Sequence, residues 1–185
     1  MSVSAPPRPT LPRLGTVTIA RVQTIEIAVH WRWIAVLFLC TWLLAQSVFP
    51  ARFPLWQQST AWLASAAVVL AGELTLLLHE LSHAAMAHTR GQRVTRIVFH
   101  GLQAETVVNR DAQTPGHDAL VALIGPGVNL VLAALFAAVR IGLQTDGPLD
   151  LVLLLQVLSN LAMAVMSLVP VGGSDGQRAL RALRR

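Results

Sequence analysis

Four long runs of apolar residues dominate the chain and are separated by shorter polar connections. They cover residues 33–49, 62–88, 120–139 and 149–169. Each run has at least the roughly 17 residues that a helix needs to cross the hydrocarbon core of a bilayer. The pattern therefore predicts four transmembrane helices rather than a water-soluble domain.

Two further stretches alternate apolar and polar residues, which is the period of a β-strand. One covers residues 16–29 before the first run, and the other covers residues 93–108 after the second run. Because two spans separate them, both stretches lie on the same side of the membrane, where they can form one sheet. We therefore expect an all-α membrane protein with a small β-sheet at the cytoplasmic membrane surface.

The N-terminal segment differs from the rest of the chain. Residues 1–14 carry four prolines and show no apolar period, which predicts a disordered cytoplasmic tail. After residue 14, the sequence shows no internal repeat and no change in amino-acid composition that would indicate a second domain. We expect residues 15–185 to form a single membrane domain.

Composition agrees with a membrane protein, because 54% of the 185 residues are hydrophobic and only 12% are charged. The basic residues are all arginines, and four precede the first span, four lie in the 89–118 connection and four lie at the C-terminus. By the positive-inside rule, both termini face the cytoplasm in a multi-pass protein of the inner membrane. This topology accounts for the net charge of +5, so nucleic acid is not an expected partner.

The second apolar run contains the sequence His79-Glu80-Leu81-Ser82-His83. Residues four apart share one face of a helix, so both imidazoles can bind one metal ion with Glu80 beside them. This is the spacing of zinc hydrolases, in which the glutamate is the general base. Ionisable residues inside a span are costly and usually functional, although hydrogen bonding between helices is the alternative explanation.

A catalytic zinc ion takes three protein ligands and keeps a fourth position for water. Glu105 and Asp175 are the candidates for the third ligand. Asp175 is favoured because Pro170 and Gly172 break the fourth helix and let the backbone turn inward. The second and fourth spans both run inward in the predicted topology, which puts Asp175 on the same side as the histidines and at a similar depth.

Several segments together resemble the site-2 protease family of intramembrane zinc metalloproteases. The resemblance rests on "HELSH", on "GPGVN" at residues 125–129, on "SLVPVGGSDG" after the last run and on "VTRIVFHGLQAE". It implies one Zn²⁺ per chain held by His79, His83 and Asp175, with Glu80 as general base. It also implies hydrolysis of a peptide bond in or near the transmembrane helix of a single-span substrate.

Three residues are candidate substrate contacts. Asn129 and Asn160 lie within the third and fourth spans, where each can bind an oxyanion or unwound backbone, or can hydrogen-bond between helices. Gly101 occupies the place of a Gly-Gly turn in the family that the chain resembles. An exposed strand edge at residues 94–99 can hold unwound substrate by strand addition, and the alternative is that this segment is only an amphipathic connector at the membrane surface.

Two other functions fit parts of the pattern. A membrane metal transporter could use the same polar side chains as a transit site, although no inverted repeat is evident. The second is a non-cleaving relative of the family that binds membrane helices. It fits because the family usually has Asn, Pro and Leu where this chain has Ser167, Gly173 and Ser174, so the motif near Asp175 is altered.

Overall fold

The computed structural model describes residues 15–22, 24–101, 104–109, 115–144 and 146–184. The predicted tail at residues 1–14 lies outside these ranges. The elements follow one another as β1 (Thr16–Val22), β2 (Ile25–His30), α1 (Trp31–Leu43), η1 (Leu44–Val48), α2 (Phe49–Arg52), α3 (Gln58–Thr89), β3 (Arg93–Phe99), β4 (Ala104–Asn109), α4 (Pro115–Leu143), α5 (Pro148–Leu168) and α6 (Asp175–Leu183).

Four helical segments of the described chain are long and apolar enough to cross a membrane. They are Trp31–Arg52, Gln58–Thr89, Asp118–Leu143 and Pro148–Leu168, and each coincides with one predicted apolar run. Large apolar side chains such as Leu63 remain exposed along them, as expected for helices whose solvent is lipid. The predicted fold class of four membrane helices with a small sheet is confirmed.

The first span changes its helical type near its end. There η1 forms a π-helical turn, in which the Phe49 N–H donates to the Leu44 carbonyl, before α2 continues the span. Pro50 explains the change, because its ring lacks an N–H and would clash with the carbonyl four residues earlier. The wider turn removes that clash without ending the span.

The four strands form one sheet in the order β1-β2-β3-β4. The central pair, β2 and β3, is parallel, and the two outer pairs are antiparallel. The parallel pair joins two segments that are separated by two membrane spans. Because β3 is paired on both sides, the predicted free edge at residues 94–99 is wrong, and the edges belong to β1 and β4.

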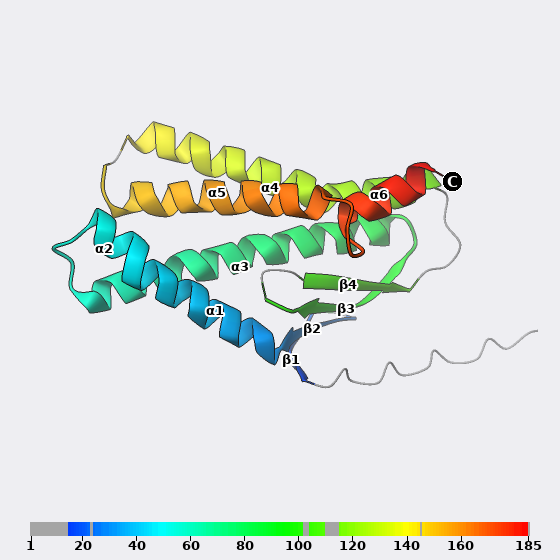
Figure 1. The fold of residues 1–185 in the computed structure, drawn as a ribbon. Helices are drawn as coiled ribbons and strands as arrows, with labels where there is room; N and C mark the ends of the chain where they lie inside the picture. Colours follow the sequence, from blue (N-terminus) through cyan, green and yellow to red (C-terminus); the bar gives the residue numbers. More distant parts are fainter. Residues whose placement is uncertain (1–14, 23, 102–103, 110–114, 145, 185) are drawn as a thin grey trace, which may run out of the picture.

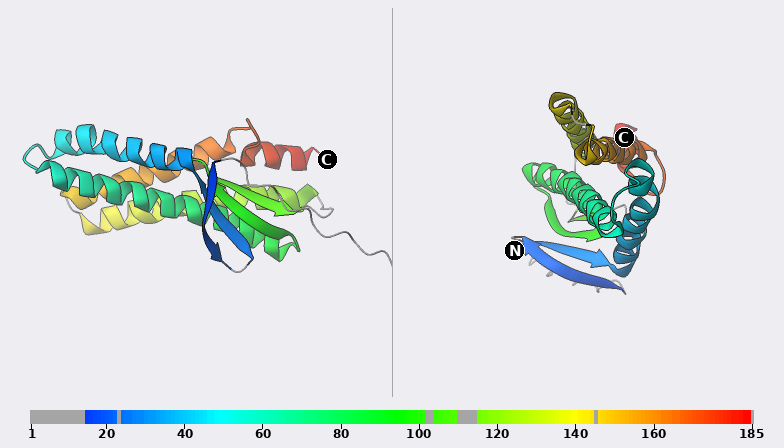
Figure 2. Two further views of the ribbon diagram at one scale, coloured as in Figure 1. Left: turned by 90° about the horizontal axis from the view of Figure 1, so that it is seen from below. Right: turned by 90° about the vertical axis from the view of Figure 1, so that its left-hand side faces the viewer.

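Helix α3 lies between the sheet and the α4–α5 pair (Figure 1). The end-on view in Figure 2 shows the same order, with β1 and β2 on the side remote from α4 and α5. The first span packs along α3, and the Trp33 indole N–H donates to a Glu73 oxygen at 2.8 Å. Helix α3 therefore contacts every other layer of the molecule.

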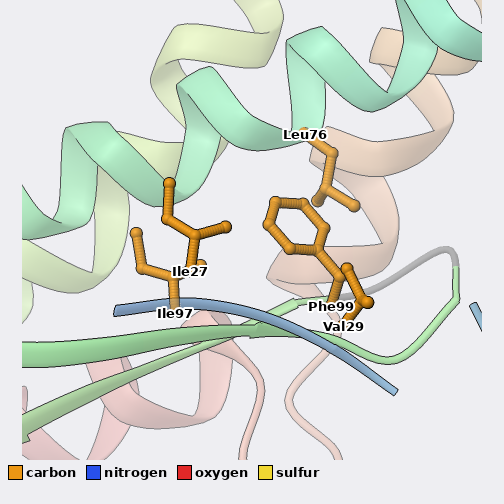
Figure 3. Packing of buried hydrophobic residues seen from close by; sticks show 5 residues of the cluster. All are labelled: Ile27, Val29, Leu76, Ile97 and Phe99. Atoms are coloured by element: carbon orange, nitrogen blue, oxygen red, sulfur yellow. The ribbon is translucent and has the colours of Figure 1, made fainter. Parts of the chain in front are cut away.

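One apolar cluster joins the sheet to α3 (Figure 3). It contains Ile27 and Val29 from β2, Ile97 and Phe99 from β3, and Leu76 from α3. Alternation along each strand puts the four strand side chains on one face of the sheet, where they pack against α3. Leu76 precedes His79 by less than one helical turn, so this cluster fixes α3 against the sheet beside the His-Glu-x-x-His sequence.

Candidate metal centre

The two histidines of α3 point their imidazoles toward the same place in the interior. Both are buried, and their Nε2 atoms lie 3.0 Å apart. The rings meet edge to face, with centroids 4.7 Å apart. The i, i+4 spacing on a single helix therefore brings two imidazole nitrogens together as the sequence predicted.

Asp175 supplies a carboxylate to the same place from the first turn of α6. Its Oδ2 atom lies 3.3 Å from the Nε2 atoms of both His79 and His83. Its other oxygen faces the Arg178 guanidinium at 3.7 Å.

The turn before α6 explains how Asp175 reaches the histidines. Gly172 and Gly173 have φ values of +62° and +88°, which lie in the left-handed region that favours glycine. Ser174 then caps α6, since its hydroxyl accepts from the Gln177 N–H at 3.2 Å and donates to the Val169 carbonyl at 2.5 Å. The chain leaves α5 through this short turn, and α6 starts at Asp175.

Gly176 packs α6 against the end of α5. A Cβ atom at this position would overlap the carbonyl group of Leu168. The absence of a side chain therefore lets the first turn of α6 approach α5 closely. This contact fixes the depth at which Asp175 enters the bundle.

The three side chains fit a metal ion. A tetrahedral Zn²⁺ with bonds of about 2.0–2.1 Å holds its ligand atoms about 3.3 Å apart. The observed separations of 3.0, 3.3 and 3.3 Å are close to that value. Two imidazoles and a carboxylate are also common donors to catalytic zinc, so the donor set suits this ion.

Helix α4 contacts the far side of both imidazoles. The Nδ1 atom of His83 lies 2.6 Å from the Val121 carbonyl oxygen. The Nδ1 atom of His79 lies 3.0 Å from the side-chain amide of Asn129, which is fully buried. Both Nε2 atoms are therefore directed away from these partners and toward Asp175.

Gly125 lies between these two partners on α4. A Cβ atom here would lie 2.6 Å from His79 Nε2 and would also overlap the His83 ring. Only a residue without a side chain leaves room for the two imidazoles. The "GPGVN" sequence thus contributes space at Gly125 and an amide at Asn129.

Glu80 lies beside the histidines and is also buried. Its Oε2 atom accepts a hydrogen bond of 2.5 Å from the hydroxyl of Thr106 on β4. The edge strand of the sheet therefore touches the acidic residue of the His-Glu-x-x-His sequence. Sequence reasoning missed Thr106, because only the register of β4 against α3 brings it to Glu80.

The chain matches curated protein sequences and a solved structure, whereas no family model matches it. A protein of Mycobacterium tuberculosis named "Putative zinc metalloprotease Rip3" is 29% identical over 169 residues, covering 90% of this chain and 43% of the relative. A Synechocystis protein named "Putative zinc metalloprotease sll0528" is 28% identical over 162 residues, covering 86% of this chain and 41% of the relative. The chain spans less than half the length of these relatives.

The structural comparison decides the fold. The site-2 protease from Methanocaldococcus jannaschii matches with a TM-score of 0.66 at 19% identity, covering 91% of this chain and 71% of that structure. This chain has the site-2 protease fold. Together with the names of the two sequence relatives, the match supports the site-2 protease family, which the sequence motifs resemble.

The structure also shows the surroundings of three other residues that the sequence singles out. Gly101 forms the bend after β3 and lies against Val36 of α1. The Asn160 amide donates to the Gln156 carbonyl of its own helix at 2.9 Å. Glu105 lies on β4 with its backbone opposite Val98. Among the described residues, the group able to hold a metal ion consists of His79, His83 and Asp175.

Proposed function

We propose that the protein is an intramembrane zinc metalloprotease that hydrolyses a peptide bond in or near the transmembrane helix of a membrane-anchored, single-span protein. One observation carries this proposal. His79, His83 and Asp175 converge in the interior of an apolar helix bundle, with Glu80 on the same helix as the histidines. A peptide-bond hydrolase needs these groups, and their location in a membrane span supports a substrate that also lies in the membrane.

The ligands in this proposal are the Nε2 atoms of His79 and His83 and the Oδ2 atom of Asp175, which together hold one Zn²⁺ per chain. When bound, the ion supplies Lewis acidity, which makes water a nucleophile at neutral pH and polarises the scissile carbonyl. The two neutral imidazoles and one carboxylate leave a net charge of +1 at the centre. That charge favours the oxyanion formed during peptide hydrolysis.

Glu80 is the proposed general acid and base. Its carboxylate takes a proton from the attacking water and later gives that proton to the departing amine. The Thr106 hydroxyl orients the carboxylate, because it donates to one oxygen and leaves the other free to accept a proton. One side chain thus serves both halves of the reaction.

The edge strand β4 is the proposed docking place for substrate. Peptide groups inside an intact helix are already hydrogen-bonded, so a substrate span must unwind before its carbonyl is attacked. An unwound segment can pair with a strand edge. Strand β4 is an edge of the sheet, and its Thr106 contacts Glu80, which supports docking here rather than on β3. In addition to this strand, Gly101 and Asn160 are proposed substrate contacts.

We further propose that the site lies toward the cytoplasmic face of the inner membrane, with both termini in the cytoplasm. The arginine distribution supports this orientation. Helix α6, which begins at Asp175, carries Arg178 and Arg181 and follows the fourth span after a short turn. A cytoplasmic location for α6 puts the three metal-binding groups on that side.

The proposal is tested by co-expressing the protein with a tagged single-span substrate and following cleavage. Glu80→Gln should abolish cleavage while bound zinc stays near one ion per chain. Glu26→Gln on β2 is the matched control, since that carboxylate pairs with Arg21 at the surface, and it should cleave normally. Cleavage that persists in Glu80→Gln would contradict the proposal. Zinc flux into proteoliposomes that is lost in His79→Ala would favour a transporter instead.

A further inference from the structure

Helix α4 presents three positions to the metal centre at a spacing of four residues. Val121 offers its backbone carbonyl to His83, Gly125 leaves space for both rings, and Asn129 offers its side-chain amide to His79. Residues four apart lie on one face of a helix, so a single face of α4 meets both imidazoles. Because this face contacts the Nδ1 atoms, it can determine which nitrogen of each ring carries the hydrogen.

His83 shows what such a contact does. A carbonyl oxygen can only accept a hydrogen bond, so the Nδ1 atom that lies 2.6 Å from the Val121 oxygen carries the hydrogen. In a neutral imidazole, Nε2 then keeps its lone pair. The Val121 carbonyl therefore makes His83 a ligand through Nε2.

Asn129 can hold the hydrogen on Nδ1 of His79 in the same way only if its amide oxygen faces the ring. The amide nitrogen lies 3.0 Å from His79 Nδ1, and the amide oxygen is buried without a partner among the described residues. The two ends of an amide have nearly the same shape, and half a turn about the last side-chain bond exchanges them. The exchange brings the oxygen to Nδ1 and gives it an N–H donor.

We propose that Asn129 is a positioning residue that accepts a hydrogen bond from His79 Nδ1–H through its amide oxygen and so keeps Nε2 of His79 available to the metal. This inference rests on the proposed function, because it assigns His79 as a metal ligand. Asn129 is fully buried and meets the ring on the side opposite to Asp175. It therefore acts through His79 and does not bind the substrate. Such outer partners fix the tautomer and orientation of metal-binding histidines.

The test is the zinc affinity of the purified full-length chain in detergent, measured by competition with a chromophoric chelator. Asn129→Leu has a similar size but cannot accept a hydrogen bond, and it should lower zinc affinity about 10- to 100-fold. Asn129→Asp keeps an acceptor and should bind zinc about as tightly as the wild type. Gln156→Leu is the matched control, because it removes another buried amide that contacts α3 at Val68, and its zinc affinity should not change.

A second measurement reads the tautomer directly and does not depend on how well a variant folds. In the zinc-loaded wild type labelled with ¹⁵N-histidine, His79 should show a protonated Nδ1 and a metal-bound Nε2. A protonated Nε2 on His79 would overturn the inference. So would an Asn129→Leu affinity equal to that of the wild type, or an Asn129→Asp affinity as weak as that of Asn129→Leu.

These outcomes are separable from failure of the proposed function. If the wild type binds one zinc ion that is lost in His79→Ala, the assignment of His79 as a metal ligand holds. The Asn129 variants then test only the role of Asn129. If the wild type binds no zinc, both proposals are wrong.

Discussion

The Thr106 hydroxyl on β4 donates a 2.5 Å hydrogen bond to Glu80 on α3, and both side chains are buried. The bond links the edge of the surface sheet to the acidic residue of the membrane helix. A hydrogen bond to a buried charged group is worth about 1.5–3 kcal/mol, so the orientation of Glu80 depends on the position of β4. Movement of this strand would change the geometry of proton transfer directly.

Replacing Thr106 by valine should lower the rate of substrate cleavage. The variant keeps the shape of the side chain and removes the donor, so we expect kcat to fall about 10- to 100-fold at unchanged zinc content. Thr106→Ser should restore most of the activity. Thr18→Val on β1 is the control, because this exposed residue belongs to the other edge strand. An unchanged kcat in Thr106→Val would show that the bond is dispensable.

Adding one methyl group at Gly125 should destroy the metal centre. In Gly125→Ala the new Cβ atom would overlap both imidazoles, so the helices must separate or the rings must turn away. We expect the zinc content of the purified variant to fall well below one ion per chain. Gly127→Ala is a close control, since it lies two residues away, about half a turn round the same helix, and a Cβ atom there meets nothing within 4 Å. Equal zinc content in the two variants would contradict this account.

Exchanging the carboxylate of Asp175 for an amide should show whether Asp175 or Glu105 is the third metal ligand. Asp175→Asn keeps the shape but removes the charge that partners two imidazoles, and we expect zinc to be lost on dialysis against a chelator. Glu105→Gln should retain zinc under the same treatment. The opposite pattern, with zinc lost from the Glu105 variant alone, would assign the third ligand to β4.

The turn before α6 yields a prediction about the departures from the family motif. Proline usually stands at the position of Gly173 in the family, but proline requires φ near −65°, whereas Gly173 has φ of +88°. Gly173→Pro should therefore lower both the thermal midpoint and zinc affinity, although it restores the family residue.

Ser174→Ala should cost about 1 kcal/mol of stability through loss of the helix cap. Ser159→Ala, whose hydroxyl bonds only within α5, is the control, and urea unfolding measures both serine variants.

Some of the fold follows from the sequence for a simple reason. A run of about 20 apolar residues has few solutions in lipid, because every backbone polar group must be paired within the segment, and the helix does this. The spacing of His79 and His83 is equally local, since it depends only on the helical period. The position of Asp175 was also accessible, because the proline and glycines before it indicate that the fourth helix breaks and the backbone turns inward there.

Other features could not be predicted from periodicity. Alternation identifies a strand but not its neighbours, so the sequence did not reveal that β3 lies inside the sheet and that β4 forms the edge. The Thr106–Glu80 bond depends on how the sheet is placed along α3, which the cluster around Leu76 determines. The contact of Asn129 with His79 depends on the packing of α4 against α3, and a lone polar residue in a span does not specify its partner.

The division of the ligands along the chain has a consequence for biosynthesis. His79 and His83 belong to the second span, whereas Asp175 follows the fourth. A nascent chain with two spans inserted carries only a pair of imidazoles, and the carboxylate joins them after the fourth span has left the ribosome and the glycine turn has folded. Under the proposed function, the hydrolytic centre is therefore assembled only after the fourth span has been made, which protects copies at earlier stages of synthesis and their neighbours in the membrane from premature cleavage.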